Sequence, residues 1–192
     1  MRRAGTHFIR DTITNNFNVK WANAKILHPV PDASVMRYMN DRYTTILIVR
    51  HPVDNLKSLY RFLKQSKEVG HFRDIENKSF SDFINGKVEY NVHMRDRWMK
   101  HCLEDPIGYW LDNSYLADFC SYMVKYEDLN NNFITTMQEL NNFLKCSNIK
   151  FVKPSIRTSP VGIGPQVEWS EADLTTLYDR VGYRLKQLNY GE

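Results

Sequence analysis

A short apolar run followed at once by a helical pattern constrains the fold of this chain most strongly. The run Ile46 to Val49 consists of aliphatic residues only, as is typical of a strand buried on both faces of a parallel sheet. Pro52 suits the first turn of a helix, because its missing N–H would have no partner there. The sequence therefore predicts a strand over 45–49 and a helix over 52–65, whose apolar face comprises Leu56, Leu59, Tyr60 and Leu63.

Arg50 and Ser58 lie where such a strand–helix unit would bind a ligand. Arg50 follows the predicted strand, and Ser58 falls on the helix that leaves the same edge of the sheet. Ligands of open α/β sheets bind at that edge, and a guanidinium fork with a hydroxyl suits a phosphate. A structural arginine and a solvated helix serine are the alternative interpretation, which the two residues favour when taken alone.

The first residues of the chain predict a second anion site. Gly5 permits a tight turn, and Thr6 and His7 open a helix predicted over 6–16. N–H groups at a helix start bind anions with the help of the helix dipole, and Arg3 adds positive charge. The spacing of a Walker A loop is absent, and a basic segment before an ordinary helix is the alternative interpretation.

Four segments in order match the pattern of one known family. Arg3-Ala-Gly-Thr-His7 is similar to its 5′-phosphosulfate loop, and Arg50 with Ser58 to its 3′-phosphate pair. Met123-Val-Lys-Tyr-Glu-Asp-Leu129 is similar to a strand whose tyrosine, here Tyr126, approaches adenine. The chain end from Trp169 to Tyr190 is similar to the family's ending. This ordered set resembles the sulfotransferase family, whose donor is 3′-phosphoadenosine 5′-phosphosulfate (PAPS).

The resemblance implies a single domain over 1–192 with a P-loop-type, three-layer α/β fold: a mostly parallel central sheet flanked by helices. It implies PAPS as donor, 3′,5′-ADP as product and no metal. The donor-binding residues that it implies are Arg3, Ala4, Gly5, Thr6, His7, Arg50, Ser58 and Tyr126.

His28 is the implied catalytic base. Lys25-Ile-Leu-His-Pro-Val-Pro31 occupies the place of the family's Lys-Thr-His-Leu-Pro segment, and a neutral imidazole can take a proton from an acceptor hydroxyl. Arg3 stands where the family usually has lysine, so it supplies charge at the leaving oxygen but is a poor proton donor. A structural role for His28 and a carboxylate base, Asp11 or Asp32, remain alternatives.

Three more residues are implied by their place in the family pattern. Arg157 lies in a loop rich in Pro, Ser and Gly where the family closes an Arg-Lys-Gly segment over the 3′-phosphate, although Lys-Gly does not follow here. His93 and Trp98 lie where family members approach the acceptor. An exposed loop arginine and a tryptophan packed in the core are the alternatives.

The family's phosphosulfate loop follows a central strand, whereas this chain begins at the loop. A missing central strand would leave open pairing edges in the sheet. Either the given start lies downstream of the true one, or a neighbouring strand closes the gap, and we favour the first explanation.

Composition bounds the class of protein. The chain has 192 residues with 42% hydrophobic and 25% charged, which suits one globular domain with a real core. Its net charge of +4 mildly favours anionic ligands but does not indicate a nucleic-acid partner. The three cysteines are widely spaced, which favours reduced thiols, and no zinc-ligand spacing is present. No segment reads as a membrane span or signal peptide, so a cytoplasmic location is expected, a removed secretory anchor being the alternative.

We therefore expect a sulfotransferase that acts on a hydroxyl or amine of a small molecule or glycan. A P-loop nucleotide kinase and an inactive nucleotide-binding relative are the alternatives, and the oligomeric state is left open. The remaining elements predicted are strands over 24–27 and 121–126, a loop over 66–78, and helices over 79–85, 88–104, 133–144 and from Ser170 to Leu188.

Overall fold

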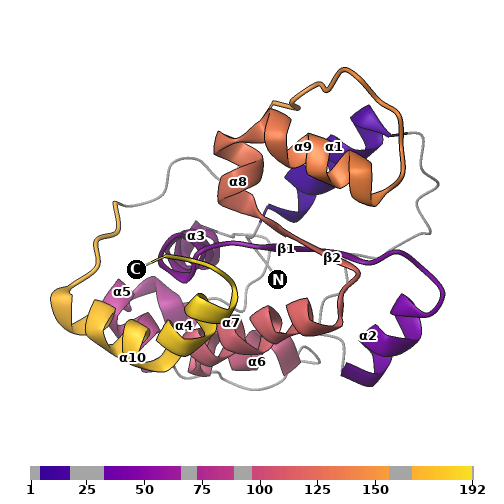
Figure 1. Ribbon diagram of the computed structural model, residues 1–192. Helices are drawn as coiled ribbons and strands as arrows, with labels where there is room; N and C mark the ends of the chain where they lie inside the picture. Colours follow the sequence, from indigo (N-terminus) through magenta and orange to yellow (C-terminus); the bar gives the residue numbers. More distant parts are fainter. Residues whose placement is uncertain (1–4, 18–32, 66–72, 89–96, 156–165, 192) are drawn as a thin grey trace. The chain divides into compact units, whose positions relative to one another are not determined.

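The computed structural model describes residues 5–17, 33–65, 73–88, 97–155 and 166–191 (Figure 1). Its contacts divide the chain into two compact units. The first unit comprises Met1–His51 and Tyr115–Arg157, and the second comprises Pro52–Ser114 and Thr158–Glu192. Each unit is described by itself, and the single domain expected over 1–192 stays a prediction.

The first unit contains a parallel pair of strands, β1 (Ile46–Val49) and β2 (Tyr122–Lys125) (Figure 1). Ile46 pairs with Tyr122 and Val49 with Lys125, so both strands end at the same level. Val49 and Val124 are buried, as the uninterrupted apolar run of β1 predicts. The predicted α/β class with a parallel sheet is confirmed, and strand 24–27 lies outside the described residues.

The helices of the first unit supply the rest of its core, and three of them lie on the same side of the strands in Figure 1. The first helix buries the apolar side chains of Phe8, Ile9 and Ile13. The last helix buries those of Phe133, Met137 and Leu140. In chain order the helices are α1 (Thr6–Asn16), α2 (Ala33–Asn40), the 3-10 turn η1 (Leu116–Phe119), α8 (Tyr126–Asn131) and α9 (Phe133–Phe143).

Helix α1 has the bounds that the sequence predicts, whereas α2 and η1 were not predicted. One detail of the strand prediction is wrong: Tyr126 is the first residue of α8 and not the last residue of a strand. Lys125 has extended dihedral angles and forms the N-cap of α8, so the chain turns from strand to helix within one residue.

The second unit is helical in its described residues. Its core consists mainly of large apolar side chains that are almost completely buried: Leu56, Leu59, Leu63, Phe83, Ile84, Leu103, Ile107, Trp110, Leu177 and Val181. Its helices are α3 (Pro52–Gln65), α4 (Arg73–Glu76), α5 (Phe80–Ile84), α6 (Arg97–Glu104), α7 (Pro106–Tyr115) and α10 (Glu171–Gln187).

Helix α3 has its predicted bounds, and Ser79 caps α5 in a capping box with Asp82. The predicted loop over 66–78 is wrong in part, because α4 forms one helical turn within it. Of the helix predicted over 88–104, only the part from Arg97 is described as helical, and Val88 is not in a helix. Helix α7 was not predicted. Within the described residues, no helix has the length and apolar character needed to cross a membrane.

The Asp173 carboxylate joins α5 to α10 within the second unit. It accepts hydrogen bonds from Ser170 Oγ at 2.7 Å, Ser81 Oγ at 2.9 Å and Asn85 Nδ2 at 2.9 Å, and its side chain is buried. Burial alone would raise the pKa of Asp173, but the hydrogen bonds from Ser170, Ser81 and Asn85 outweigh it and hold that pKa below its usual value.

Asp173→Asn should therefore lower the free energy of unfolding by about 2 kcal/mol at neutral pH, the usual size of a charged hydrogen-bonded group that is lost. Because the folded pKa is the lower one, the carboxylate contributes fully above the unfolded pKa of about 3.9 and loses its contribution as the pH falls through the folded value. Urea unfolding of wild type and variant at a series of pH values should show that the difference between their free energies of unfolding becomes smaller in acid. Asp179→Asn, exposed on the same helix, is the matched control, and a difference independent of pH would contradict the assignment.

Candidate active site

The strand register brings Arg50 and Tyr126 together at the carboxyl edge of the sheet. Each follows the last residue of a paired strand, Val49 in β1 and Lys125 in β2. The Arg50 guanidinium carbon lies 4.7 Å from the centroid of the Tyr126 ring, a cation–π contact. Arg50 is half-buried, so its charge lies at the edge of the sheet in a partly desolvated setting.

The start of α1 lies against the same tyrosine. Gly5 is the N-cap residue of α1, with φ 93° and ψ 26°, and its carbonyl oxygen accepts the N–H of Ile9 at 3.0 Å. A Cβ atom on Gly5 would lie 2.3 Å from Tyr126 Cδ2 and 3.3 Å from Ile48 Cδ1. Only glycine fits both this left-handed conformation and this close approach. The N–H groups at the start of α1 and the Arg50 guanidinium therefore flank one aromatic ring.

The neighbourhood of Tyr126 is fixed by two further contacts. Phe8, one turn into α1, packs edge-to-face on the tyrosine with ring centroids 6.0 Å apart. Glu127, the next residue of α8, accepts a hydrogen bond from the His51 N–H at 2.9 Å, which joins the end of β1 to the start of α8. The sequence analysis gave no role to either residue. The spacing of the apolar residues in α1 indicates that Phe8 is buried. No pattern in the sequence indicates the contact of Glu127 with His51.

These residues make this edge of the sheet the candidate site for an anion. A helix N-terminus and a guanidinium both favour negative charge, and a half-buried aromatic ring offers a face to a planar group. Of the predicted donor-binding residues, the structure brings Gly5 and Arg50 against Tyr126, and Thr6 and His7 follow Gly5 as the first residues of α1. Their roles towards a donor stay predictions.

The other predicted site residues lie in the second unit or outside the described ranges. Ser58 lies on α3 in the second unit, so its pairing with Arg50 stays a prediction. The backbone of Trp98 belongs to α6, also in the second unit. The residues that lie outside the described ranges are Arg3, Ala4, His28, Asp32, His93 and Arg157. Asp11, the other carboxylate considered as a base, pairs with Arg10 at 3.0 Å.

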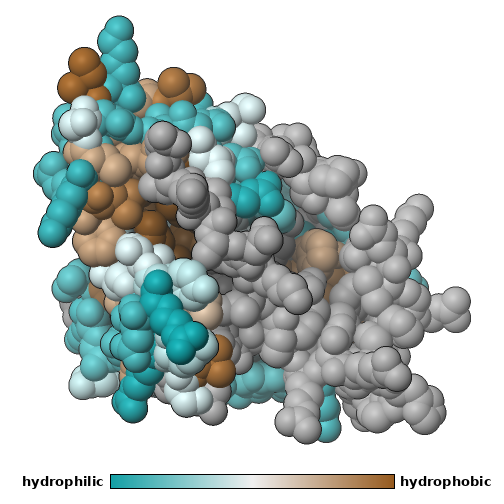
Figure 2. Space-filling view, turned by 90° about the vertical axis from the view of Figure 1, so that its right-hand side faces the viewer, coloured by the Kyte–Doolittle hydropathy of each residue, from teal (hydrophilic) through white to brown (hydrophobic). Residues whose placement is uncertain are grey.

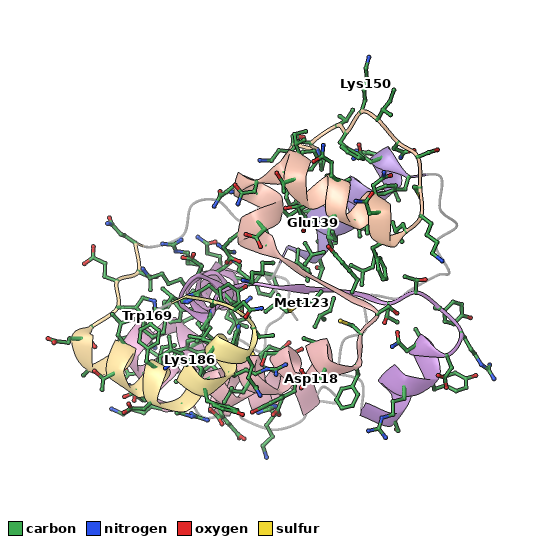
Figure 3. The ribbon with its side chains drawn as sticks, viewed as in Figure 1. Asp118, Met123, Glu139, Lys150, Trp169 and Lys186 are labelled. Atoms are coloured by element: carbon green, nitrogen blue, oxygen red, sulfur yellow. The ribbon has the colours of Figure 1, made fainter. Side chains whose placement is uncertain are left out.

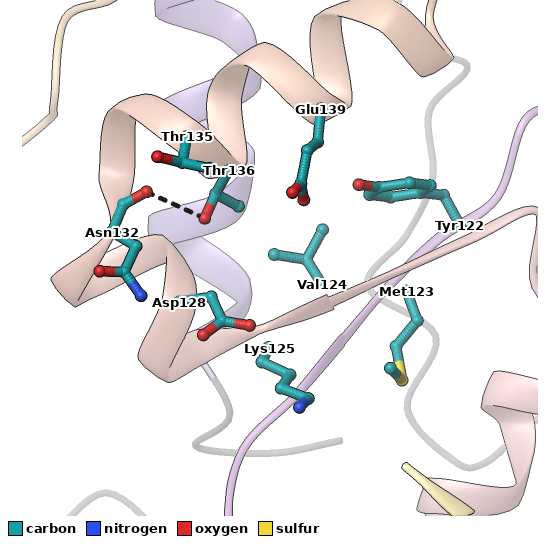
Figure 4. Close-up of a pocket in the computed structure, with 9 residues that line it drawn as sticks. All are labelled: Tyr122, Met123, Val124, Lys125, Asp128, Asn132, Thr135, Thr136 and Glu139. Carbon is teal, nitrogen blue, oxygen red and sulfur yellow. Dashed lines mark hydrogen bonds between the residues drawn. The ribbon is translucent and has the colours of Figure 1, made fainter. Parts of the chain in front are cut away.

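A polar cavity of about 270 Å³ lies on the other side of Lys125, between β2 and the helices that follow it (Figure 4). Burial and the nearby Glu139 carboxylate raise the pKa of Tyr122, so its phenol stays a neutral hydrogen-bond donor. Thr136 Oγ1 donates to the Asn132 carbonyl at 3.1 Å. The sequence analysis missed this cavity. Lys125 and Asp128 lie in the segment Met123–Leu129 but were given no role, and the other polar residues of the lining follow no motif: Asn132, Thr135, Thr136 and Glu139.

The comparison with known families decides the class of protein. The family model described as "Sulfotransferase domain" matches residues 23–157. The chain belongs to the sulfotransferase domain family. The matched part of this sulfotransferase domain includes His28, Arg50, Ser58, Tyr126 and Arg157, while the Gly5 turn precedes it. No curated protein and no solved structure matches the chain.

Proposed function

We propose that this sulfotransferase domain uses PAPS as its donor and transfers the sulfuryl group to a hydroxyl or amine. The observation that supports the donor most directly is the arrangement at the sheet edge. There the glycine-capped start of α1 and the Arg50 guanidinium flank the Tyr126 ring. Family membership supplies the reaction class, and the charges at this edge suit a donor that carries phosphate groups.

The residues of the site fit the parts of such a donor. The N–H groups of Thr6 and His7, with Arg3 and Ala4 before Gly5, would bind the 5′-phosphosulfate end. Arg50 and Ser58 would hold the 3′-phosphate, with Arg157 covering it. Tyr126 would lie beside the adenine. When bound, PAPS supplies the activated sulfuryl group, and this chain supplies positive charge, orientation and a base.

His28 would act as that base. As the acceptor oxygen forms its bond to sulfur, its proton passes to the His28 imidazole, and the electron pair of the breaking S–O bond passes to the bridging oxygen of the nucleotide. Negative charge grows on that bridging oxygen. Arg3 and the N–H groups after Gly5 would stabilise it, as cations and oriented donors do in phosphoryl transfer. Arg3 would do so as a permanent cation and not as a proton donor.

The acceptor would be a small molecule or a glycan, bound beside His93 and Trp98, and no nucleic-acid partner or metal is needed for this chemistry. We infer a cytoplasmic setting from Cys102, Cys120 and Cys146, which are all free thiols. A second candidate follows from Arg3 standing where the family usually has lysine: a relative that binds the nucleotide without turning it over. Donor binding without transfer to any acceptor would identify it.

Calorimetric titration of the full chain with 3′,5′-ADP, ATP and 5′-AMP tests the donor. We expect 3′,5′-ADP to bind and 5′-AMP to bind much more weakly, because only the former carries the 3′-phosphate assigned to Arg50. Equal affinity for ATP and 3′,5′-ADP would contradict the proposal, and so would no binding of any of the three.

His28→Ala should lower the rate of sulfuryl transfer by about 10²–10⁴-fold, the usual contribution of a positioned base. Its dissociation constant for 3′,5′-ADP should stay within about twofold of the wild-type value, because the base touches the acceptor and not the nucleotide. The measurement is transfer of labelled sulfate from PAPS to an acceptor found by screening. His101→Ala, in α6 with its imidazole 3.7 Å from Asp112, is the control and should retain transfer. If instead Asp32→Asn abolishes transfer and His28→Ala does not, the base is the carboxylate.

A further inference from the structure

The segment that follows α9 carries an unbalanced positive charge. From residue 140 to residue 167 the chain contains no aspartate or glutamate, while it contains Lys145, Lys150, Lys153 and Arg157. These four charges equal the net charge of +4 of the whole chain. We call residues 145–153, which are all described, the basic tip. Among the described residues, no carboxylate forms an ion pair with its three lysines.

The basic tip is held in one conformation by α1. The Asn16 side chain bonds to both backbone groups of Val152, donating to its carbonyl at 2.8 Å and accepting its N–H at 2.5 Å. The Asn148 side chain donates to the Asn16 carbonyl, and the Phe151 ring lies 6.2 Å from that of Phe17. These contacts fix the backbone of the basic tip against the rest of the first unit. The side chains on its outer side therefore have defined directions.

The outer side of the tip combines the exposed Lys145 and Lys150 with bare aliphatic side chains, while Lys153 Nζ donates a hydrogen bond to the Asn130 carbonyl of α8. Ile149 is 91% exposed and Val152 is 63% exposed, although the backbone around them is hydrogen-bonded. Lys150 points away from the fold at the end of this segment (Figure 3). Figure 2 shows hydrophobic residues that protrude beside hydrophilic ones at the top of the view. An ordered segment that exposes an isoleucine so completely lacks the burial that normally stabilises such a side chain.

We propose that the basic tip binds the surface of an anionic lipid bilayer. The lysines would be attracted to the negative surface, each favouring binding by about fivefold. Ile149 and Val152 would enter the boundary between headgroups and acyl chains, where aliphatic surface leaves water. An anionic glycan or a nucleic acid would satisfy the lysines alone and would leave both aliphatic side chains in water, so the bilayer fits the whole set of residues better. The proposal does not depend on the identity of the sulfuryl donor.

Co-sedimentation of the full chain with vesicles tests this proposal, using phosphatidylcholine vesicles with and without phosphatidylserine. We expect binding only to the vesicles with phosphatidylserine, weakened by added salt because the attraction is screened. The double variant Ile149→Ser/Val152→Ser should lower the partition coefficient about tenfold or more. Lys150→Gln and Lys145→Asn should each lower it about fivefold. Asparagine is chosen at 145 because the backbone there has φ 53°, which asparagine tolerates.

Matched controls come from the second unit. Tyr183→Ser removes a large side chain that is 74% exposed on α10, and Lys87→Gln removes an exposed lysine. Neither should change the partition coefficient, and circular dichroism melting should show every variant folded. Absence of vesicle binding would overturn the proposal, as would equal effects of tip and control variants. So would a pattern in which the lysine variants lose binding to heparin and to vesicles alike while the Ile149/Val152 variant keeps both, since that pattern indicates an anionic polymer as the partner.

Discussion

Arg50→Ala should remove most of the affinity of this domain for 3′,5′-ADP. A charge-assisted bidentate contact in a half-buried site is lost, and the phosphate that it paired is left without its partner. The expected cost is roughly 2–4 kcal/mol, or about 30- to 1000-fold in the dissociation constant. The calorimetric titration described above measures it directly. The preference for 3′,5′-ADP over 5′-AMP should disappear at the same time, because the lost contact is the one made to the 3′-phosphate.

Two matched variants separate this contact from a general effect of charge. Arg50→Lys keeps the positive charge but not the planar fork, so its affinity should lie between those of wild type and Arg50→Ala. Arg10→Ala removes an arginine from the same unit that pairs with Asp11 at 3.0 Å, and it should bind 3′,5′-ADP as wild type does. Wild-type affinity in a folded Arg50→Ala protein would show that the 3′-phosphate is held elsewhere.

Gly5→Ala should destabilise the chain by about 2–4 kcal/mol. The left-handed φ of 93° costs an alanine roughly 1 kcal/mol or more. Its Cβ would also lie 2.3 Å from Tyr126 Cδ2, and relieving such an overlap usually costs about 1–3 kcal/mol. Because relief moves the start of α1 away from the strand ends, the affinity for 3′,5′-ADP should fall as well. Urea unfolding followed by titration measures both effects.

Gly182→Ala is the natural control for this substitution. Gly182 lies inside α10, and a Cβ there would meet nothing within 4 Å. Alanine in a helix interior is more favourable than glycine by about 0.5–1 kcal/mol, so Gly182→Ala should raise the free energy of unfolding. The two glycine variants should therefore change stability in opposite directions. A Gly5→Ala protein as stable as wild type would mean that α1 does not begin against Tyr126.

Local signals in the sequence were sufficient to predict the helices that have a clear starting residue and one apolar face. Helix α3 begins at Pro52 and buries the four residues chosen for its apolar face, and Ser79 and Ser170 cap the helices that follow them. In each of these cases the residue that starts the helix and the apolar residues of its buried face lie within a few turns of one another. The helix can therefore be predicted without knowledge of any distant contact.

Helix α7 was missed because it has no polar face to contrast with an apolar one. It buries Trp110 and Ile107 and also Asn113 and Ser114, so its pattern is neither amphipathic nor continuously apolar. Asn113 Nδ2 and Ser114 Oγ donate to carbonyls within α7, those of Tyr109 and Leu111. Ser114 also has a partner far along the chain, because Arg184 on α10 donates to the Ser114 carbonyl at 2.6 Å and to Ser114 Oγ at 3.2 Å. No local rule predicts a partner of that kind.

For the site, the sequence predicted Arg50 at the carboxyl edge of a parallel sheet, and the family resemblance implied Tyr126 as a donor-binding residue, but the contact between the two was not predicted. The sequence predicted the glycine turn before α1 as a feature of the backbone, but not that the turn packs on the Tyr126 ring. That contact depends on the tertiary packing of α1 on the strands. The start of the short helix at Tyr126 was mistaken for a strand end because the resemblance implied a strand that continues to this tyrosine, whereas the chain turns into α8 directly after Lys125.

The guanidinium of Arg50 lies over one face of the Tyr126 ring, and Gly5 and Phe8 lie against the same ring. A planar ligand can therefore stack on Tyr126 only through the face that Arg50 does not cover. Stacking tolerates any base, because every base has a π-face. Discrimination among nucleobases by this ring should accordingly be modest, and selection of the nucleotide would depend on the number and position of its phosphates.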